Sequence, residues 1–185
     1  LTLKLIAYAG LIGLPNAGKS TLICAISKVH SKIASYPFTT RQPILGYVSV
    51  EEDWKESHFV VADLPGIIEG AHEGKGLGHQ FLRHAERTKV LVHLIDMAGT
   101  DGRDPLEDFR VINHEIEAYS DRLAAKPRVV VANKMDTPEA VKNLRRFKRK
   151  HRLPVFPVSA LEKQGFEPLI LEIRKLLVEQ KKVQE

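Results

Sequence analysis

The chain has 185 residues, 43% of them hydrophobic, and a formal net charge of +5. This length suits one domain with a substantial core, and the hydrophobic fraction is ordinary for a globular protein. The sequence shows no apolar run long enough to cross a membrane, and we expect no signal peptide. The single cysteine, Cys24, excludes an internal disulfide and is expected to be a small core residue. We therefore expect a cytoplasmic or organelle-matrix protein.

The first expected element is a strand over residues 3–12, an apolar run that is typical of burial on both faces. Residues 13–20, GLPNAGKS, then fit the phosphate-binding pattern G-x-x-x-x-G-K-S, and a helical pattern follows over 21–26. Glycines let such a loop wrap around a phosphate, so that backbone N–H groups point at its oxygens. Lys19 supplies charge toward the β- and γ-phosphates, and the Ser20 hydroxyl can bind Mg²⁺. The candidate nucleotide contacts in this loop are Gly13, Pro15, Asn16, Ala17, Gly18, Lys19, Ser20 and Thr21.

Asn16 has a second candidate role within this loop. Its side-chain carbonyl can help to bind a monovalent cation, such as K⁺, near the α- and γ-phosphates. A cation there would stabilise developing negative charge, as an arginine finger does. We therefore count Asn16 and Lys19 among the candidate catalytic residues.

The segment YPFTT, residues 36–40, is the candidate for a switch that senses the γ-phosphate. Such a switch needs a hydroxyl that joins the Mg²⁺ shell only when the triphosphate is present. Thr40 is the first choice for this hydroxyl and Thr39 the second, with Phe38 a further nucleotide contact. The alternative is that these threonines belong to a solvent-facing loop.

A second candidate switch, DLPG, begins at Asp63 after an expected strand over residues 59–62. Asp63 can hold a Mg²⁺-bound water, and the Gly66 backbone N–H can meet a γ-phosphate, so Gly66 and Thr40 are also candidate catalytic residues. Ile67 follows, where many GTPases carry a glutamine that orients the attacking water. Because isoleucine cannot bond water, we expect slow intrinsic hydrolysis.

Residues 133–136, NKMD, follow an expected strand over 128–132 and point to guanine. The Asp136 carboxylate can accept hydrogen bonds from N1–H and the N2 amine of guanine, a donor pair that adenine lacks. Asn133 is expected to tie this turn to the phosphate loop, and the Lys134 stem to cover the base. The alternative is that Asp136 merely caps the next helix.

Ser159 and Ala160 complete the set, and we expect the Ala160 N–H to donate to guanine O6. Four elements in this order predict a protein that binds GTP and GDP and thus argue against an ATPase. The candidate Mg²⁺ ligands are Ser20, Thr40 and Asp63.

Buried strands alternate with helical patterns, which predicts an α/β fold of the P-loop G-domain type. We expect a mostly parallel six-stranded sheet with helices on both faces and one antiparallel edge strand. That edge strand, over residues 44–50, forms a hairpin with the strand over 59–62. The other expected strands are 3–12, 90–95, 128–132 and 155–158.

A basic helix over residues 141–152 has two open interpretations: a surface for RNA phosphates, or a solvated face. Val141, Leu144 and Phe147 are expected to form its narrow buried stripe. The histidines His72, His79 and His84 lack the spacing of a metal site, and we expect surface or packing roles.

The chain resembles the Obg (CgtA) GTPases, a branch of the P-loop translation-factor class. The resemblance rests on residues 13–20 and 36–40 and above all on 63–84, DLPGIIEGAHEGKGLGHQFLRH, and it covers essentially the whole chain. It implies a switch that binds the large ribosomal subunit and its RNA, with slow hydrolysis and sensitivity to guanosine tetraphosphate (ppGpp). Arg41 departs from the apolar residue that is usual after the threonine pair. Because family members carry flanking domains, the resemblance implies that residues 1–185 are one excised G domain, which we expect to be a monomer.

Two functional classes remain open. The first is a timer that binds GTP, engages a ribosomal target and leaves it on hydrolysis. The second is a nucleotide-sensing binding module whose hydrolysis alone is negligible, an alternative that Ile67 keeps open.

Overall fold

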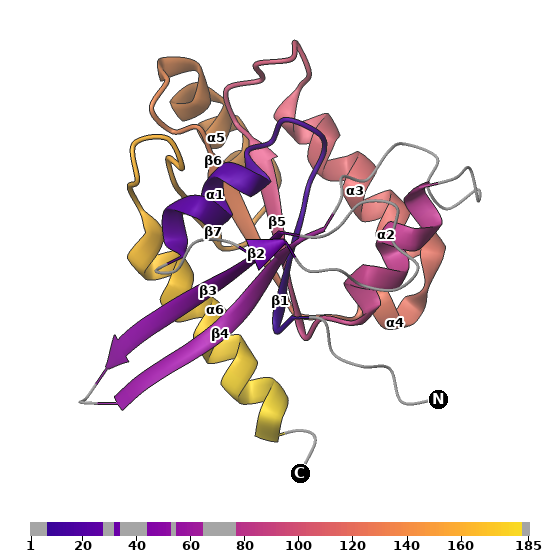
Figure 1. The fold of residues 1–185 in the computed structure, drawn as a ribbon. Coiled ribbons are helices and arrows are strands. Elements are labelled where there is room, and N and C mark those ends of the chain that lie inside the picture. Colours follow the sequence, from indigo (N-terminus) through magenta and orange to yellow (C-terminus); the bar gives the residue numbers. More distant parts are fainter. Residues whose placement is uncertain (1–6, 28–31, 34–43, 53–54, 65–76, 183–185) are drawn as a thin grey trace.

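The computed structural model in Figure 1 describes residues 7–27, 32–33, 44–52, 55–64 and 77–182. The elements are β1 (Ala9–Ile12), α1 (Lys19–Ile26), β2 (Lys32–Ile33), β3 (Ile44–Glu52), β4 (Lys55–Asp63), α2 (Leu77–Glu86), β5 (Val90–Asp96), α3 (Pro105–Tyr119), α4 (Asp121–Ala124), β6 (Arg128–Asn133), α5 (Pro138–Lys150), β7 (Val155–Pro157) and α6 (Phe166–Lys182). Within the described ranges, no helix has both the length and the apolar character that crossing a membrane requires.

One sheet runs through the molecule in the order β2-β3-β4-β1-β5-β6-β7. β1 pairs in parallel with β4 and β5, and the parallel pairing continues through β6 to β7. β3 is antiparallel to β4, as expected for the hairpin. The predicted P-loop-type α/β sheet is therefore confirmed. The two-residue β2 adds a further antiparallel strand, so β3 is not outermost.

Helices cover both faces of this sheet, and successive residues of the central strands face opposite sides. Leu11 and Val92 belong to a core cluster with α1 and α6, whereas Ile12 and Leu91 belong to one with α2, α3 and α4. A third cluster, which includes Phe147, holds α5 against α3 and β6. All residues of β1 and β5 are buried, because these central strands lie beneath helices on both sides.

The structure corrects two expectations about helix faces. Cys24 is exposed, because α1 packs through Leu22, Ile23 and Ile26. Val141 is 39% exposed and not part of the buried stripe of α5. The buried stripe is formed by Ala140, Asn143, Leu144 and Phe147. The packed face is therefore rotated about the helix axis, away from Val141 and toward Ala140 and Asn143.

His93 is a buried polar group in the middle of β5. Its ring stacks on Phe109 with 5.2 Å between the ring centroids, and its Nδ1 has no partner among the described residues. Burial lowers the pKa of His93 to about 3, and the nearby positive charge of Arg128 adds to the effect. The ring is therefore neutral in the folded protein at neutral pH.

Replacing this group, as in His93→Leu, is expected to reduce the acid sensitivity of folding. The folded-state pKa of about 3 lies below the ordinary 6.5, so the unfolded chain binds the proton more readily. Stability from the neutral ring is present above pH 6.5 and is lost as the pH falls toward 3, by up to roughly 1.4 kcal/mol per pH unit. Unfolding free energies from urea titrations at several pH values measure this slope. The exposed His58→Leu is the control, and equal slopes in His93→Leu and the wild type would contradict the prediction.

Candidate nucleotide-binding site

The predicted nucleotide motifs meet at one edge of the sheet. The phosphate loop, residues 13–18, joins β1 to α1, Asp63 ends β4, and Asn133 ends β6. Ser159 follows β7 on the same side. These positions are the carboxyl ends of parallel strands, where open α/β sheets bind ligands (Figure 1).

Lys19 occupies the inside of the phosphate loop. Its side-chain Nζ donates to the carbonyls of Gly13 at 3.0 Å and Leu14 at 3.1 Å. Burial lowers the pKa of Lys19, and the nearby Asp63 carboxylate opposes this shift. A buried ammonium group whose hydrogen bonds, among the described residues, go to neutral carbonyls is well suited to an anionic ligand.

Ser20 and Asp63 form the second part of the phosphate end. The Ser20 hydroxyl donates to Asp63 Oδ2 at 2.5 Å. The other carboxylate oxygen, Oδ1, is buried and has no partner among the described residues. Burial raises the pKa of Asp63, whereas the Ser20 hydrogen bond and the Lys19 charge lower it less strongly. A hydroxyl beside a carboxylate with a free oxygen is a donor set that fits Mg²⁺ and its bound water.

Asn133 connects the phosphate loop to the base-binding turn. Its Nδ2 donates to the Ala17 carbonyl at 2.8 Å, which is the expected tie. Its Oδ1 accepts the Ala160 N–H at 3.1 Å. The sequence assigns that N–H to guanine O6, and in this structure it is engaged by Asn133.

Asp136 is not the cap of α5. The capping oxygen belongs to Thr137, whose Oγ1 accepts the Ala140 N–H at 3.2 Å. Asp136 Oδ1 instead accepts the Ser159 hydroxyl at 2.6 Å. The helix-cap alternative is therefore wrong, and the carboxylate is oriented from the loop after β7.

Lys134 reaches across to a carboxylate that sequence reasoning did not single out. Its Nζ lies 2.8 Å from Asp96 Oδ2 and 2.7 Å from the Thr100 hydroxyl. Although burial raises the pKa of Asp96, hydrogen bonds from Lys134 and Thr100 lower it overall. An aspartate at the end of the apolar run over 90–95 is the signal that could have found it.

Two further contacts to the phosphate loop were also missed. Asn16 Nδ2 donates to Asp101 Oδ2 at 3.1 Å, and the Arg103 guanidinium donates to the Pro15 carbonyl at 3.0 Å. Both partners come from the loop between β5 and α3, residues 97–104. Sequence motifs give no signal for these pairs, because they join segments that are far apart in the chain.

Several predicted residues cannot be placed. Phe38, Thr39, Thr40, Gly66, Ile67 and His72 lie outside the described residues, as does the side chain of His79. Among the remaining residues, no group of three His, Cys, Asp or Glu side chains could hold a metal ion. His84 is partly buried, which lowers its pKa, and the charges of Arg87 and Arg83 act in the same direction.

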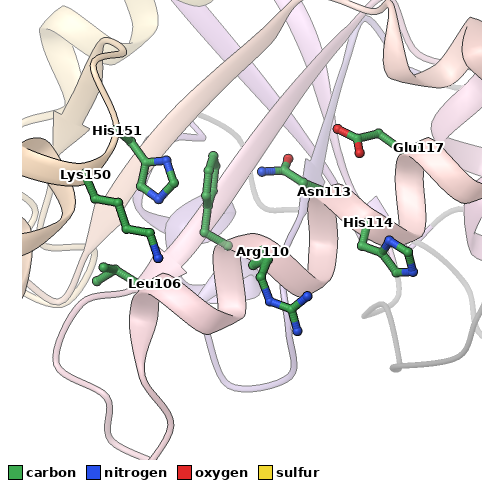
Figure 2. Close-up of a pocket in the computed structure, with 8 residues that line it drawn as sticks. Leu106, Arg110, Asn113, His114, Glu117, Lys150 and His151 are labelled. Carbon is green, nitrogen blue, oxygen red and sulfur yellow. The ribbon is translucent and has the colours of Figure 1, made fainter.

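A separate hollow of about 270 Å³ lies between α3 and the end of α5. Figure 2 shows Lys150 and His151 on one side of it and His114 and Glu117 on the other. Phe109 contributes an apolar wall. Its lining is of mixed charge and includes none of the nucleotide motifs, so it is distinct from the site described above.

A family model described as a 50S ribosome-binding GTPase matches residues 8–134. The chain belongs to this family. The chain is also 56% identical over 179 residues to the GTPase Obg of Geobacillus thermodenitrificans, which covers 96% of this chain and 41% of the relative. For the GTPase Obg of Symbiobacterium thermophilum the identity is 55% over 173 residues, with coverage of 92% and 40%. The chain thus spans about two fifths of these relatives, and the resemblance to Obg is confirmed.

Solved structures agree with this assignment. Aquifex aeolicus Era bound to GDP and AlF₄⁻ matches with a TM-score of 0.67 and 26% identity, over 92% of this chain and 56% of Era. The G domain of Thermotoga maritima FeoB matches with a TM-score of 0.64 over 94% of this chain and 97% of FeoB. Its identity of 18% supports the fold alone.

Substitution of Gly18 tests the packing of the phosphate loop against Asn133. A Cβ at Gly18 would lie 2.4 Å from Asn133 Nδ2, and the backbone has a φ of 94°. Gly102 is the matched control, because its φ is 74° and a Cβ there meets nothing within 4 Å. Gly18→Ala is expected to cost about 1–3 kcal/mol more in unfolding free energy than Gly102→Ala. Equal losses in denaturant titrations would show that the Asn133 tie does not constrain this position.

Proposed function

We propose that this domain binds GTP and GDP and hydrolyses GTP slowly, as a molecular switch in large ribosomal subunit assembly. One observation carries the proposal: the buried Asn133 side chain joins the phosphate loop at Ala17 to the loop after β7 at Ala160. This link fixes the position of the loop proposed to bind the polyphosphate relative to the loop proposed to bind guanine. A ligand that carries both groups fits this arrangement better than a phosphate or a base alone.

The residues of the phosphate end have defined tasks in this proposal. Lys19 binds the β- and γ-phosphates and neutralises their charge. Ser20 and Asp63 would hold Mg²⁺, with Thr40 from the first switch segment, and the ion would offset negative charge on the phosphates. Gly66 would sense the γ-phosphate through its N–H. Phosphoryl transfer to water needs this positioning and charge more than a covalent nucleophile.

K⁺ and ppGpp are further proposed ligands of the same site. Asn16 retains a side-chain carbonyl that can accept a monovalent cation, because its Nδ2 is the atom that bonds Asp101. ppGpp carries the guanine and 5′-diphosphate of GDP, so the same residues can bind it. Era has been solved with MgGDPNP and nucleotides of 16S ribosomal RNA, at a TM-score of 0.63 and 26% identity, which supports a ribosomal partner here. Such a partner would place the protein in the cytoplasm or an organelle matrix.

Asp136→Asn is expected to shift base preference from guanine to xanthine. The carboxylate would accept two hydrogen bonds from guanine, each worth roughly 1.5–3 kcal/mol to a charged acceptor, so GDP affinity should fall about 100-fold or more. An asparagine amide can instead donate to the extra carbonyl of xanthine. Competition between fluorescent GDP and unlabelled GDP, xanthosine diphosphate and ADP measures the shift. A base preference identical to that of the wild type would contradict guanine recognition by this residue.

Large ribosomal subunits are expected to accelerate single-turnover GTP hydrolysis in potassium, from a slow basal rate. Negligible hydrolysis both with and without subunits, together with tight guanine nucleotide binding, would instead favour the nucleotide-sensing module. Ile67 keeps that alternative open, because it stands where many GTPases orient water with glutamine.

Binding of large ribosomal subunits, measured at several salt concentrations, tests α5 as the RNA-facing surface. Arg145 and Arg149 are exposed, whereas Arg146 bonds Asn143 and Asp104 and is a poorer candidate. Arg145→Glu with Arg149→Glu should weaken subunit binding and reduce its salt dependence. Lys175→Glu with Lys181→Glu on α6 is the matched charge change. Equal effects of the two pairs would favour the solvated-face interpretation of α5.

A further inference from the structure

The β5–α3 loop, residues 97–104, contacts the phosphate loop at two adjacent residues. Asp101 Oδ2 accepts Asn16 Nδ2 at 3.1 Å, and Arg103 donates to the Pro15 carbonyl at 3.0 Å. Asp101 and Arg103 also lie 3.4 Å apart, as an ion pair. The outer side of the phosphate loop is therefore held by two linked side chains.

Arg103 is fixed from its other side. Its Nε lies 3.3 Å from both carboxylate oxygens of Asp108, which is buried near the start of α3. The guanidinium thus spans from a helix to the phosphate loop. A side chain anchored in this way holds Pro15 at a fixed distance from the start of α3.

The start of the same loop contacts the base-binding turn. Asp96, the last residue of β5, accepts the backbone N–H groups of Ala98, Gly99 and Thr100. It also accepts the Lys134 ammonium and the Thr100 hydroxyl, the latter at 2.5 Å. One loop therefore contacts both ends of the proposed nucleotide site.

The backbone shows that these contacts fall on strained positions. Among the described non-glycine residues, only Asn16, Lys134 and Lys163 have a positive φ, with values of 64°, 64° and 55°. Such left-handed conformations cost free energy and persist where the surroundings hold them. The β5–α3 loop holds Asn16 through Asp101 and Lys134 through Thr100.

The chemistry of Asp101 also fixes which way the Asn16 amide faces. The Asp101 carboxylate oxygen accepts the hydrogen bond, so the NH₂ of Asn16 faces it. The carbonyl oxygen of Asn16 then remains for the side of the loop where the nucleotide would bind. A neutral or apolar residue at 101 would leave both amide orientations open.

We propose that Asp101 and Arg103 are positioning residues for the phosphate loop, which orient Asn16 and slow the release of bound nucleotide. This inference rests on the proposed function, since it assumes a guanine nucleotide in the site. Asp101 acts through Asn16, and Arg103 through the Pro15 carbonyl.

Release of a fluorescent GDP analogue, chased with unlabelled GDP in stopped flow, tests the proposal on the 185-residue chain. Asp101→Ala and Arg103→Ala should each accelerate release about three- to tenfold, the range for loss of one hydrogen bond. Asp101→Asn should give a rate between those of Asp101→Ala and the wild type, because its amide can accept from Asn16 in one orientation but can also donate to it in the other. Arg122→Ala, an exposed arginine on α4, is the control and should leave the rate unchanged.

A double-mutant cycle separates positioning from general stability. If Asp101 acts through Asn16, adding Asp101→Ala to Asn16→Ala should change the release rate little further. Additive effects, or single variants that release GDP at the wild-type rate, would overturn the inference. Should Asp101→Ala fail to fold, Asp101→Asn and Arg103→Lys are compared in its place, and wild-type release from Arg103→Lys would again overturn it. Failure of the wild type to bind the GDP analogue would refute the proposed function instead.

Discussion

The arrangement of the site depends on the side chain of one buried residue. Asn133 is 2% exposed and bonds a carbonyl that lies 116 residues away and an amide that lies 27 residues away. An amide buried without partners would cost roughly 1–3 kcal/mol for each unsatisfied group. The phosphate loop, the turn after β6 and the loop after β7 are therefore constrained to one relative position. The close approach of Gly18 to the same side chain adds a steric limit to this constraint.

Burial disfavours the charged forms of the two ionisable groups at the phosphate end of the site. Lys19 and Asp63 carry opposite charges, and burial is the largest cause of the pKa shift of each group, toward its neutral form. Within the described part of the chain, two carbonyl groups accept hydrogen bonds from Lys19, and the Ser20 hydroxyl donates to one oxygen of Asp63. Such a site favours a ligand that brings negative charge to Lys19 and a hard cation to Asp63. A nucleoside triphosphate with bound Mg²⁺ brings both the negative charge and the cation.

Much of the fold could be predicted because its determinants are local. Apolar runs that alternate with helical patterns identified the parallel strands, and the strand ends then grouped Asp63, Asn133 and Ser159 at one edge. The buried face of each helix was harder to predict from the sequence. Cys24 and Val141 have apolar or small side chains, yet the direction of packing turned both toward solvent. Composition alone does not fix the rotation of a helix about its axis, because that depends on the surface it meets.

By itself, the sequence determined most of the strands and their succession along the chain, the nucleotide motifs and the chemistry of their side chains. Only the tertiary structure decided which partners those side chains take. It assigned the cap of α5 to Thr137 and paired Asp136 with the Ser159 hydroxyl. It also brought Asp101 to Asn16 and Arg103 to Pro15 of the phosphate loop, 85 and 88 residues away in the chain. These choices escape sequence reasoning because a hydrogen bond between distant segments leaves no periodicity or spacing in the chain. It is fixed only when the strands that carry the segments are packed side by side.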